Sequence, residues 1–119
     1  KHNLKADSQE QKIILKTQHK SHIHKLEEII HCESDQSYTT VYTEKEKIVV
    51  SKTMKYYDDL LSPKGFYRLH KAHLVDLRHV VQIHKSDGGE AELSNGQRVP
   101  CSQQKREDFL RTVDGLGLH

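Results

Sequence analysis

Residues 67–77 have the sequence YRLHKAHLVDL, in which an apolar series is interleaved with cations and histidines. Leu69, Leu74, Val75 and Leu77 are expected to be buried, because aliphatic side chains of this size occur mainly in protein cores. The polar residues between them need either solvent at a bend or an anionic partner, since charged groups are costly to bury alone. The rest of the sequence bears on which of the two applies.

The length and composition of the chain indicate one domain with a modest hydrophobic core. The chain has 119 residues, 34% of them hydrophobic, with no tryptophan and two phenylalanines, so its core must be built mainly from Ile, Leu, Val and Tyr. No run approaches the roughly 20 apolar residues of a membrane span, and residues 1–11 lack the apolar core of a secretory signal. We therefore expect a cytoplasmic protein with no membrane partner. Cys32 and Cys101 are expected to be reduced thiols rather than a disulfide.

Charge is distributed in patches. Residues 1–25 carry six lysines against two acids, residues 26–62 four against eight, and residues 63–119 nine Lys or Arg against seven, for a net charge of +2. Purely electrostatic binding to nucleic acid is not expected from so small a net charge. Any binding of a polyanion must be local.

Short β-branched or aromatic segments dominate the first two thirds of the chain and indicate antiparallel strands. Helices long enough for parallel crossovers are lacking between them, which excludes a doubly wound nucleotide-binding fold. We expect a mainly β fold of stacked antiparallel sheets with one short central helix and a C-terminal helix. The predicted strands cover 12–17, 21–26, 28–34, 38–44, 47–52, 66–70 and 80–85.

Local signals define the remaining elements. Thr53 is the expected N-cap of a helix through MKYYDDLL, which Pro63 and Gly65 terminate. Residues 71–79 are expected to form a turning, partly buried connection. Further on, Gly88 and Gly89 mark one turn, and Asn95 with Gly96 predicts a type I′ hairpin turn. Ser102 is the expected N-cap of the last helix, whose apolar face is Phe109, Leu110 and Val113.

Sequence motifs for catalysis are absent. The chain has no GxSxG, no phosphate-binding glycine loop and no GxGxxG, and its adjacent acidic pairs cannot converge as a carboxylate dyad. We therefore expect neither an enzyme nor a cofactor. Ten histidines raise a metal hypothesis, strongest at His22 and His24 on one strand face. Acidic ligands at suitable offsets are lacking, so surface or turn histidines are favoured over a metal site.

Three blocks of sequence, in order, resemble the LytTR family of bacterial DNA-binding domains. They are EEIIHCESDQSYTTVYTE (27–44), FYRLHKAHLVDLRHVVQI (66–83) and LSNGQRVPCSQQK (93–105). The resemblance covers the chain from about Ile13 to Val113. It implies the output domain of a two-component response regulator in a phosphorelay, whose loops enter successive major grooves of double-stranded promoter DNA. It also implies a dimer on repeated half-sites, an upstream receiver domain and a cognate sensor histidine kinase.

The same resemblance assigns contact residues to three regions. Gln36, Ser37 or Thr39 are expected at base edges from the first loop, Arg68, His70 and Lys71 at a bend facing DNA, and Gln103, Gln104 and Lys105 after Pro100 and Ser102. The alternative to DNA contact for the last group is that these residues form an ordinary solvated start of a helix. Residues 1–11 are expected to be a linker to the missing receiver-like domain, 12–114 the DNA-binding domain and 115–119 a disordered tail.

Departures from the family pattern leave room for other functions. Ala72 replaces a usual Ser, His73 an aromatic residue, Asp76 an Asn, and Gln103 a common Arg, which removes one guanine reader and one phosphate charge. Altered sequence preference or weaker affinity is therefore expected. The alternative from another class is a β-rich protein-interaction module that has lost DNA binding. A third hypothesis is metal or pH sensing by the histidines.

Overall fold

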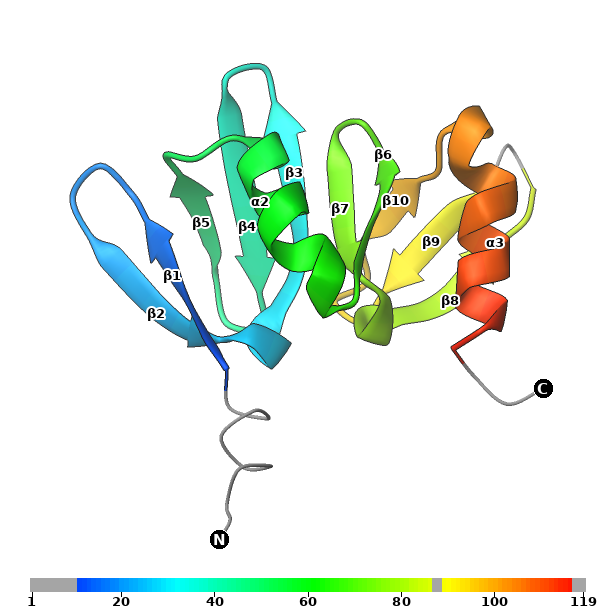
Figure 1. Cartoon of the computed structure of the whole chain (residues 1–119), viewed down its shortest axis with the longest axis horizontal. Helices are drawn as coiled ribbons and strands as arrows, with labels where there is room; N and C mark the ends of the chain where they lie inside the picture. The colour runs from blue at the N-terminus through cyan, green and yellow to red at the C-terminus, as the bar shows by residue number, and fades with distance from the viewer. Residues whose placement is uncertain (1–10, 87–88, 117–119) are drawn as a thin grey trace, which may run out of the picture.

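The computed structural model describes residues 11–86 and 89–116, and within these ranges the chain forms three antiparallel sheets (Figure 1). The expected mainly β class, with a central and a C-terminal helix, is confirmed. The predicted linker and tail, and the predicted turn at Gly88, lie mostly or wholly outside the described residues. The strands are β1 (Lys12–Lys16), β2 (Ser21–Lys25), β3 (Ile29–Asp35), β4 (Tyr38–Thr43), β5 (Lys47–Val50), β6 (Phe66–His70), β7 (His73–Asp76), β8 (Val80–His84), β9 (Glu90–Leu93) and β10 (Arg98–Pro100). The helices are α2 (Met54–Leu61) and α3 (Arg106–Asp114), with 3-10 turns η1 (Leu26–Glu28), η2 (Ser62–Lys64), η3 (Leu77–His79) and η4 (Gln103–Lys105).

The central sheet has five strands in the order β5-β4-β3-β7-β6. Strand β7 was not expected, because residues 71–79 were predicted to be a connection; they contain a strand and the turn η3 instead. Leu74, Val75 and Asp76 are all fully buried, so β7 lacks the alternation by which a half-exposed strand is detected.

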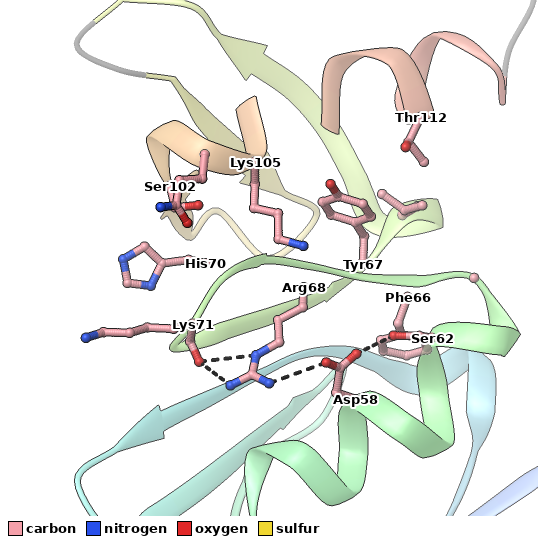
Figure 2. A pocket seen from close by; sticks show the side chains of 13 residues that line it. Asp58, Ser62, Phe66, Tyr67, Arg68, His70, Lys71, Ser102, Lys105 and Thr112 are labelled. Carbon is pink, nitrogen blue, oxygen red and sulfur yellow. Dashed lines mark hydrogen bonds and ion pairs between the residues drawn. The ribbon is translucent and has the colours of Figure 1, made fainter. Parts of the chain in front are cut away.

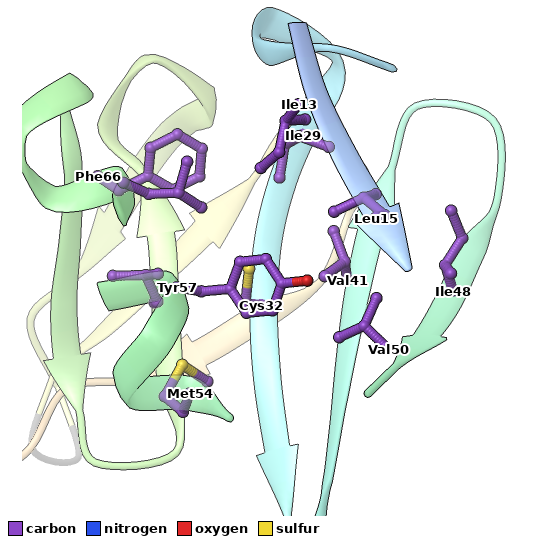
Figure 3. Close-up of a cluster of buried hydrophobic side chains, with 12 residues drawn as sticks. Ile13, Leu15, Ile29, Cys32, Val41, Ile48, Val50, Met54, Tyr57 and Phe66 are labelled. Atoms are coloured by element: carbon purple, nitrogen blue, oxygen red, sulfur yellow. The ribbon is translucent and has the colours of Figure 1, made fainter. Parts of the chain in front are cut away.

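Two hydrophobic cores lie on opposite faces of this sheet. In the first, Met54 and Tyr57 of α2 and Leu15 of β1 pack toward Cys32 on β3 (Figure 3). In the second, Leu69 packs with Phe109 of α3 and with the three-stranded sheet β10-β9-β8. Adjacent residues of β7 enter different cores, Leu74 the first and Val75 the second.

Helix α2 begins as predicted, with the Thr53 hydroxyl accepting a hydrogen bond from the Tyr56 N–H at 3.2 Å. The last helix does not. Ser102 makes no capping hydrogen bond through its side chain, and η4 precedes an α-helix that begins only at Arg106. The Ser102 N–H is instead used across the fold, donating to the Leu69 carbonyl of β6 at 2.8 Å.

The β9–β10 hairpin has a different turn from the one predicted. Gly96 has φ of +89°, but Asn95 is not in the left-handed region that a type I′ turn requires. The Gly96 N–H donates to the Leu93 carbonyl at 2.8 Å, and the Leu93 N–H donates to the Gln97 carbonyl at 2.8 Å. These bonds define a three-residue loop ending in a left-handed glycine.

Both cysteines are free and buried, as expected from the sequence. Complete burial raises the pKa of the Cys32 thiol to about 12. Among the described residues, no helix is long and apolar enough to cross a bilayer.

Three connections meet at one edge of the molecule. Figure 1 shows the β3–β4 turn, the β6–β7 turn and the segment entering α3 at the same edge, whereas β1 begins at the opposite one. Backbone hydrogen bonds hold the three connections together. The Ser34 N–H donates to the Ala72 carbonyl at 2.9 Å, and the Ser102 N–H bond to Leu69 attaches η4 to β6.

One buried charge lies at the end of β7. Asp76 is 0% exposed and binds Arg78 through two contacts, Nε to Oδ1 at 2.9 Å and Nη2 to Oδ2 at 3.0 Å. Its Oδ1 also accepts the Arg78 backbone N–H at 2.9 Å. The acidic departure from the family pattern is thus paired with a cation two residues later.

Replacing Arg78 by Ala should therefore destabilise the fold by about 1 to 3 kcal/mol, because the Asp76 carboxylate loses its side-chain partner. Urea unfolding measures the loss, and the double variant Asp76→Asn/Arg78→Ala should recover part of it. Arg98→Ala is the matched control: its ion pair with Glu90 at 3.3 Å is solvated, so less than about 1 kcal/mol is expected. Equal losses in Arg78→Ala and Arg98→Ala would contradict this account.

Candidate nucleic-acid interface

Two of the three predicted contact regions line one hollow. Arg68, His70 and Lys71 enter it from β6 and the following turn, and Gln104 and Lys105 enter it from η4 (Figure 2). The two regions are 32 or more residues apart in sequence and are joined by the Ser102–Leu69 backbone hydrogen bond. Gln103 is exposed on η4 but is not among the residues that line the hollow.

The Arg68 side chain is half-buried in the hollow and is paired there rather than free at a bend. Its Nη2 and Nε donate to the Lys71 carbonyl at 2.7 and 3.3 Å, and its Nη1 lies 3.3 Å from Asp58 Oδ2 (Figure 2). The guanidinium therefore closes the β6–β7 turn and ties it to α2. Arg68 therefore lines the hollow, as expected of a contact residue, but its donors are already used within the protein.

His70 also shapes the turn. Its Nδ1 accepts a hydrogen bond from the Ala72 N–H at 3.0 Å. An accepting Nδ1 carries no proton, so the N–H of the ring is at Nε2. His70 consequently offers its Nε2–H as a donor to a ligand.

The exposed cations of the hollow are lysines. Lys71 and Lys105 are both exposed, and the Lys105 ammonium lies 5.9 Å from the centre of the Tyr67 ring. The Tyr67 hydroxyl donates to Asp108 of α3, which fixes the ring beneath the lysine. Together with the amide of Gln104, these groups can bind phosphate oxygens and hydrogen-bond a base edge.

The first predicted region, at the β3–β4 turn, is only partly available. Gln36 and Ser37 are exposed, and Gln36 adopts a left-handed φ of +57°. Thr39 is 2% exposed and lies within strand β4 rather than on the turn, so its expected contact with a base edge does not fit the structure. Tyr38, which was not predicted as a contact residue, is 62% exposed beside them. Its position next to the turn was the only sequence signal for it.

A row of histidines continues from the hollow into the sheet. The ring centres of His70 and His73 are 5.3 Å apart, and those of His73 and His31 are 5.8 Å apart. His31 is 1% exposed, stacks on Tyr42 at 4.7 Å, and has no hydrogen-bond partner for either ring nitrogen among the described residues. The histidines as a group were expected at the surface or in turns; His31, which lies in the predicted strand 28–34, is instead buried in β3.

Burial, with a smaller effect from neighbouring His73, lowers the pKa of the His31 imidazole from 6.5 to about 4. Between these pH values the unfolded chain binds a proton at His31 and the folded chain does not, so stability is lost as pH falls. From pH 7.5 to 4 this residue should cost about 3 kcal/mol of unfolding free energy.

Urea unfolding in EDTA at several pH values tests this. His31→Phe keeps a ring against Tyr42 but should make the unfolding free energy less dependent on pH than in the wild type. His19→Gln, at an exposed position, is the control and should leave the dependence unchanged. A wild-type pH dependence in His31→Phe would show that His31 is protonated normally in the folded state.

Two groups of described residues have metal-ligand chemistry: His22, His24 and Glu46, and His31, Glu33 and His73. In each group the candidate ligand atoms lie within 4.8 Å of one another. The acidic member of the first group was missed in the sequence because Glu46 is 22 residues beyond His24 and is brought there only by the fold.

Comparison with known proteins gives consistent results. The family model "LytTR: LytTr DNA-binding domain" matches residues 7–114. A solved structure, the "LytTr DNA-binding domain of putative methyl-accepting/DNA response regulator from Bacillus cereus", is similar with a TM-score of 0.74 and 22% identity, covering 88% of this chain and 97% of that one.

The curated relatives are proteins much longer than this chain. "Transcriptional regulatory protein LytR" of Staphylococcus aureus, strains N315 and NCTC 8325 / PS 47, is 22% identical over 96 residues, or 79% of this chain. The aligned region is 39% of each relative, so the chain spans well under half of their length.

Proposed function

The chain belongs to the LytTR family of DNA-binding domains, and from that premise we propose that it binds DNA in a sequence-specific manner as the output domain of a two-component response regulator. The observation that carries this proposal is the hollow in which Lys71 and Gln104, from separate predicted regions, lie together. A family of DNA-binding domains gives no reason to expect catalysis.

The arrangement of loops supports binding to a duplex. The β3–β4 turn, the β6–β7 turn and η4 follow one another along a single edge, so they can meet successive parts of a groove and its flanking phosphates (Figure 1). We assign Lys71 and Lys105 to phosphates, and Gln36, Ser37, His70 and Gln104 to base edges. Arg68 acts indirectly by holding the turn, and Gln103 replaces a phosphate contact with a neutral amide.

The remaining features of the proposal rest on the family resemblance together with the names of the relatives. One relative is named "Transcriptional regulatory protein LytR", and the Bacillus cereus domain is titled as part of a "putative methyl-accepting/DNA response regulator". By analogy this domain follows a receiver domain controlled by a sensor histidine kinase, works in the cytoplasm and binds promoter repeats as a dimer. Loops entering major grooves of repeated half-sites are part of the same proposal.

Single substitutions should separate the two kinds of contact. Lys71→Ala should weaken binding to all duplexes and lower the slope of log affinity against log salt by about one. Gln104→Ala should cost about 1 to 3 kcal/mol of binding free energy for the preferred sequence and relax specificity at one position. Lys12→Ala removes an exposed lysine at the opposite edge and should change neither quantity. Fluorescence anisotropy over a salt series measures both effects.

The first experiment is selection of a randomised duplex pool on the domain over several rounds. Enrichment of a repeated half-site with a steep salt dependence supports the proposal. Failure to enrich any sequence, with early elution from heparin at low salt, would favour the interaction module, for which the internal pairing of Arg68 is the supporting observation.

A further inference from the structure

Two histidines of the β1–β2 hairpin face the rest of the protein. His22 and His24 are two residues apart on β2 and therefore share a face. Their partners across the hairpin are Leu15 and Ile13, which are buried in the first core. The two imidazoles therefore lie at the junction between the hairpin and the five-stranded sheet, and His24 is 8% exposed.

A carboxylate from the other side of the junction meets them. Glu46 Oε2, in the turn between β4 and β5, lies 3.2 Å from His24 Nε2 and 3.7 Å from His22 Nδ1. The backbone of Glu46 is fixed on both sides, because the Thr43 hydroxyl accepts its N–H at 3.0 Å and donates to its carbonyl at 2.9 Å. Three donor atoms from two separate segments thus converge on one point.

A second carboxylate orients His24. Glu28 Oε1 lies 2.9 Å from His24 Nδ1 and accepts the Lys25 N–H at 3.1 Å. Because the Glu28 carboxylate accepts at Nδ1, the ring keeps its proton on that nitrogen, which leaves the Nε2 lone pair available to an ion shared with Glu46. Metal-binding histidines commonly have such a carboxylate behind them.

We propose that His22, His24 and Glu46 form a binding site for a late first-row divalent cation, best matched by Zn²⁺, with Glu28 orienting His24. Two imidazole nitrogens and one carboxylate oxygen are a common zinc ligand set, and the fourth position is open to water. Ligand atoms about 2.0 Å from a tetrahedral ion are about 3.3 Å apart, close to the contacts of 3.2 and 3.7 Å.

The bound ion would join the hairpin to the central sheet. Among the described backbone groups, Ser51 already donates to Lys16 at 3.0 Å across the same junction. A cation adds bonds between β2 and the β4–β5 turn, and it binds the folded chain preferentially because the unfolded chain does not hold the three ligands together. The proposal is independent of DNA binding, so its failure would leave the proposed function intact.

Titration of the tag-free chain with Zn²⁺ after EDTA treatment, in competition with a chromophoric chelator, tests the site. One equivalent should bind, and the thermal unfolding midpoint should rise and return on adding EDTA. His22→Gln and Glu46→Gln, both at positions with solvent access, should each lower the affinity at least tenfold. Glu28→Gln should lower it tenfold to a hundredfold through the orientation of His24. Co²⁺ should give the visible absorption of a four-coordinate ion.

Two control variants locate the ion. His84→Gln breaks the contact of His84 Nε2 with Glu92 Oε1 at 2.8 Å, a His–Glu pair outside both three-residue groups, and should not change the affinity. His73→Gln alters the other candidate group and should also have no effect. Loss of binding in His73→Gln alone would place the ion around His31 and overturn the proposal. Wild-type affinity in both His22→Gln and Glu46→Gln would also overturn it, as would the absence of saturable binding to the wild type. His24 would then only bridge the carboxylates of Glu28 and Glu46.

Discussion

The position of β7 between β3 and β6 is the constraint on which the rest of the fold depends. Leu74 and Val75 point to opposite faces, so this short strand belongs to both cores and fixes the sheet relative to α2 on one side and α3 on the other. The turn preceding β7 is thereby held at the end of the strands, where the Ala72 carbonyl accepts a hydrogen bond from the Ser34 N–H. The loops that we propose as DNA contacts are placed by the packing of aliphatic residues rather than by their own polar chemistry.

This constraint explains the mixture of apolar and basic residues in residues 67–77. The aliphatic side chains pack into the two cores, Asp76 is buried in its pair with Arg78, and the polar residues around the turn either shape it or face solvent. Arg68 and His70 satisfy backbone groups of the turn, and Lys71 is left exposed. Because the net charge is only +2, the proposed binding of DNA depends on such local placement of cations.

The sequence was informative where local chemistry decides structure. The Thr53 cap, the alternating strands and the loop positions of Lys71 and Gln104 follow from propensity, periodicity and family resemblance. Sequence reasoning missed the features that depend on what lies across the fold. These are strand β7, the burial of His31 and Thr39, and the pairing of Arg68 with Asp58. The meeting of His24 with Glu46 is of the same kind, because no local pattern joins residues 22 positions apart.

The opposite placement of β1 and the three contact loops has a consequence for how such domains diversify (Figure 1). A segment joined ahead of β1 approaches the edge remote from the loops, so replacing it does not disturb their geometry. Gene fusion can therefore attach new sensory modules to an unchanged reader of DNA. Conversely, substitutions in the loops leave the attachment point at β1 unchanged, so the two ends of the domain can evolve separately.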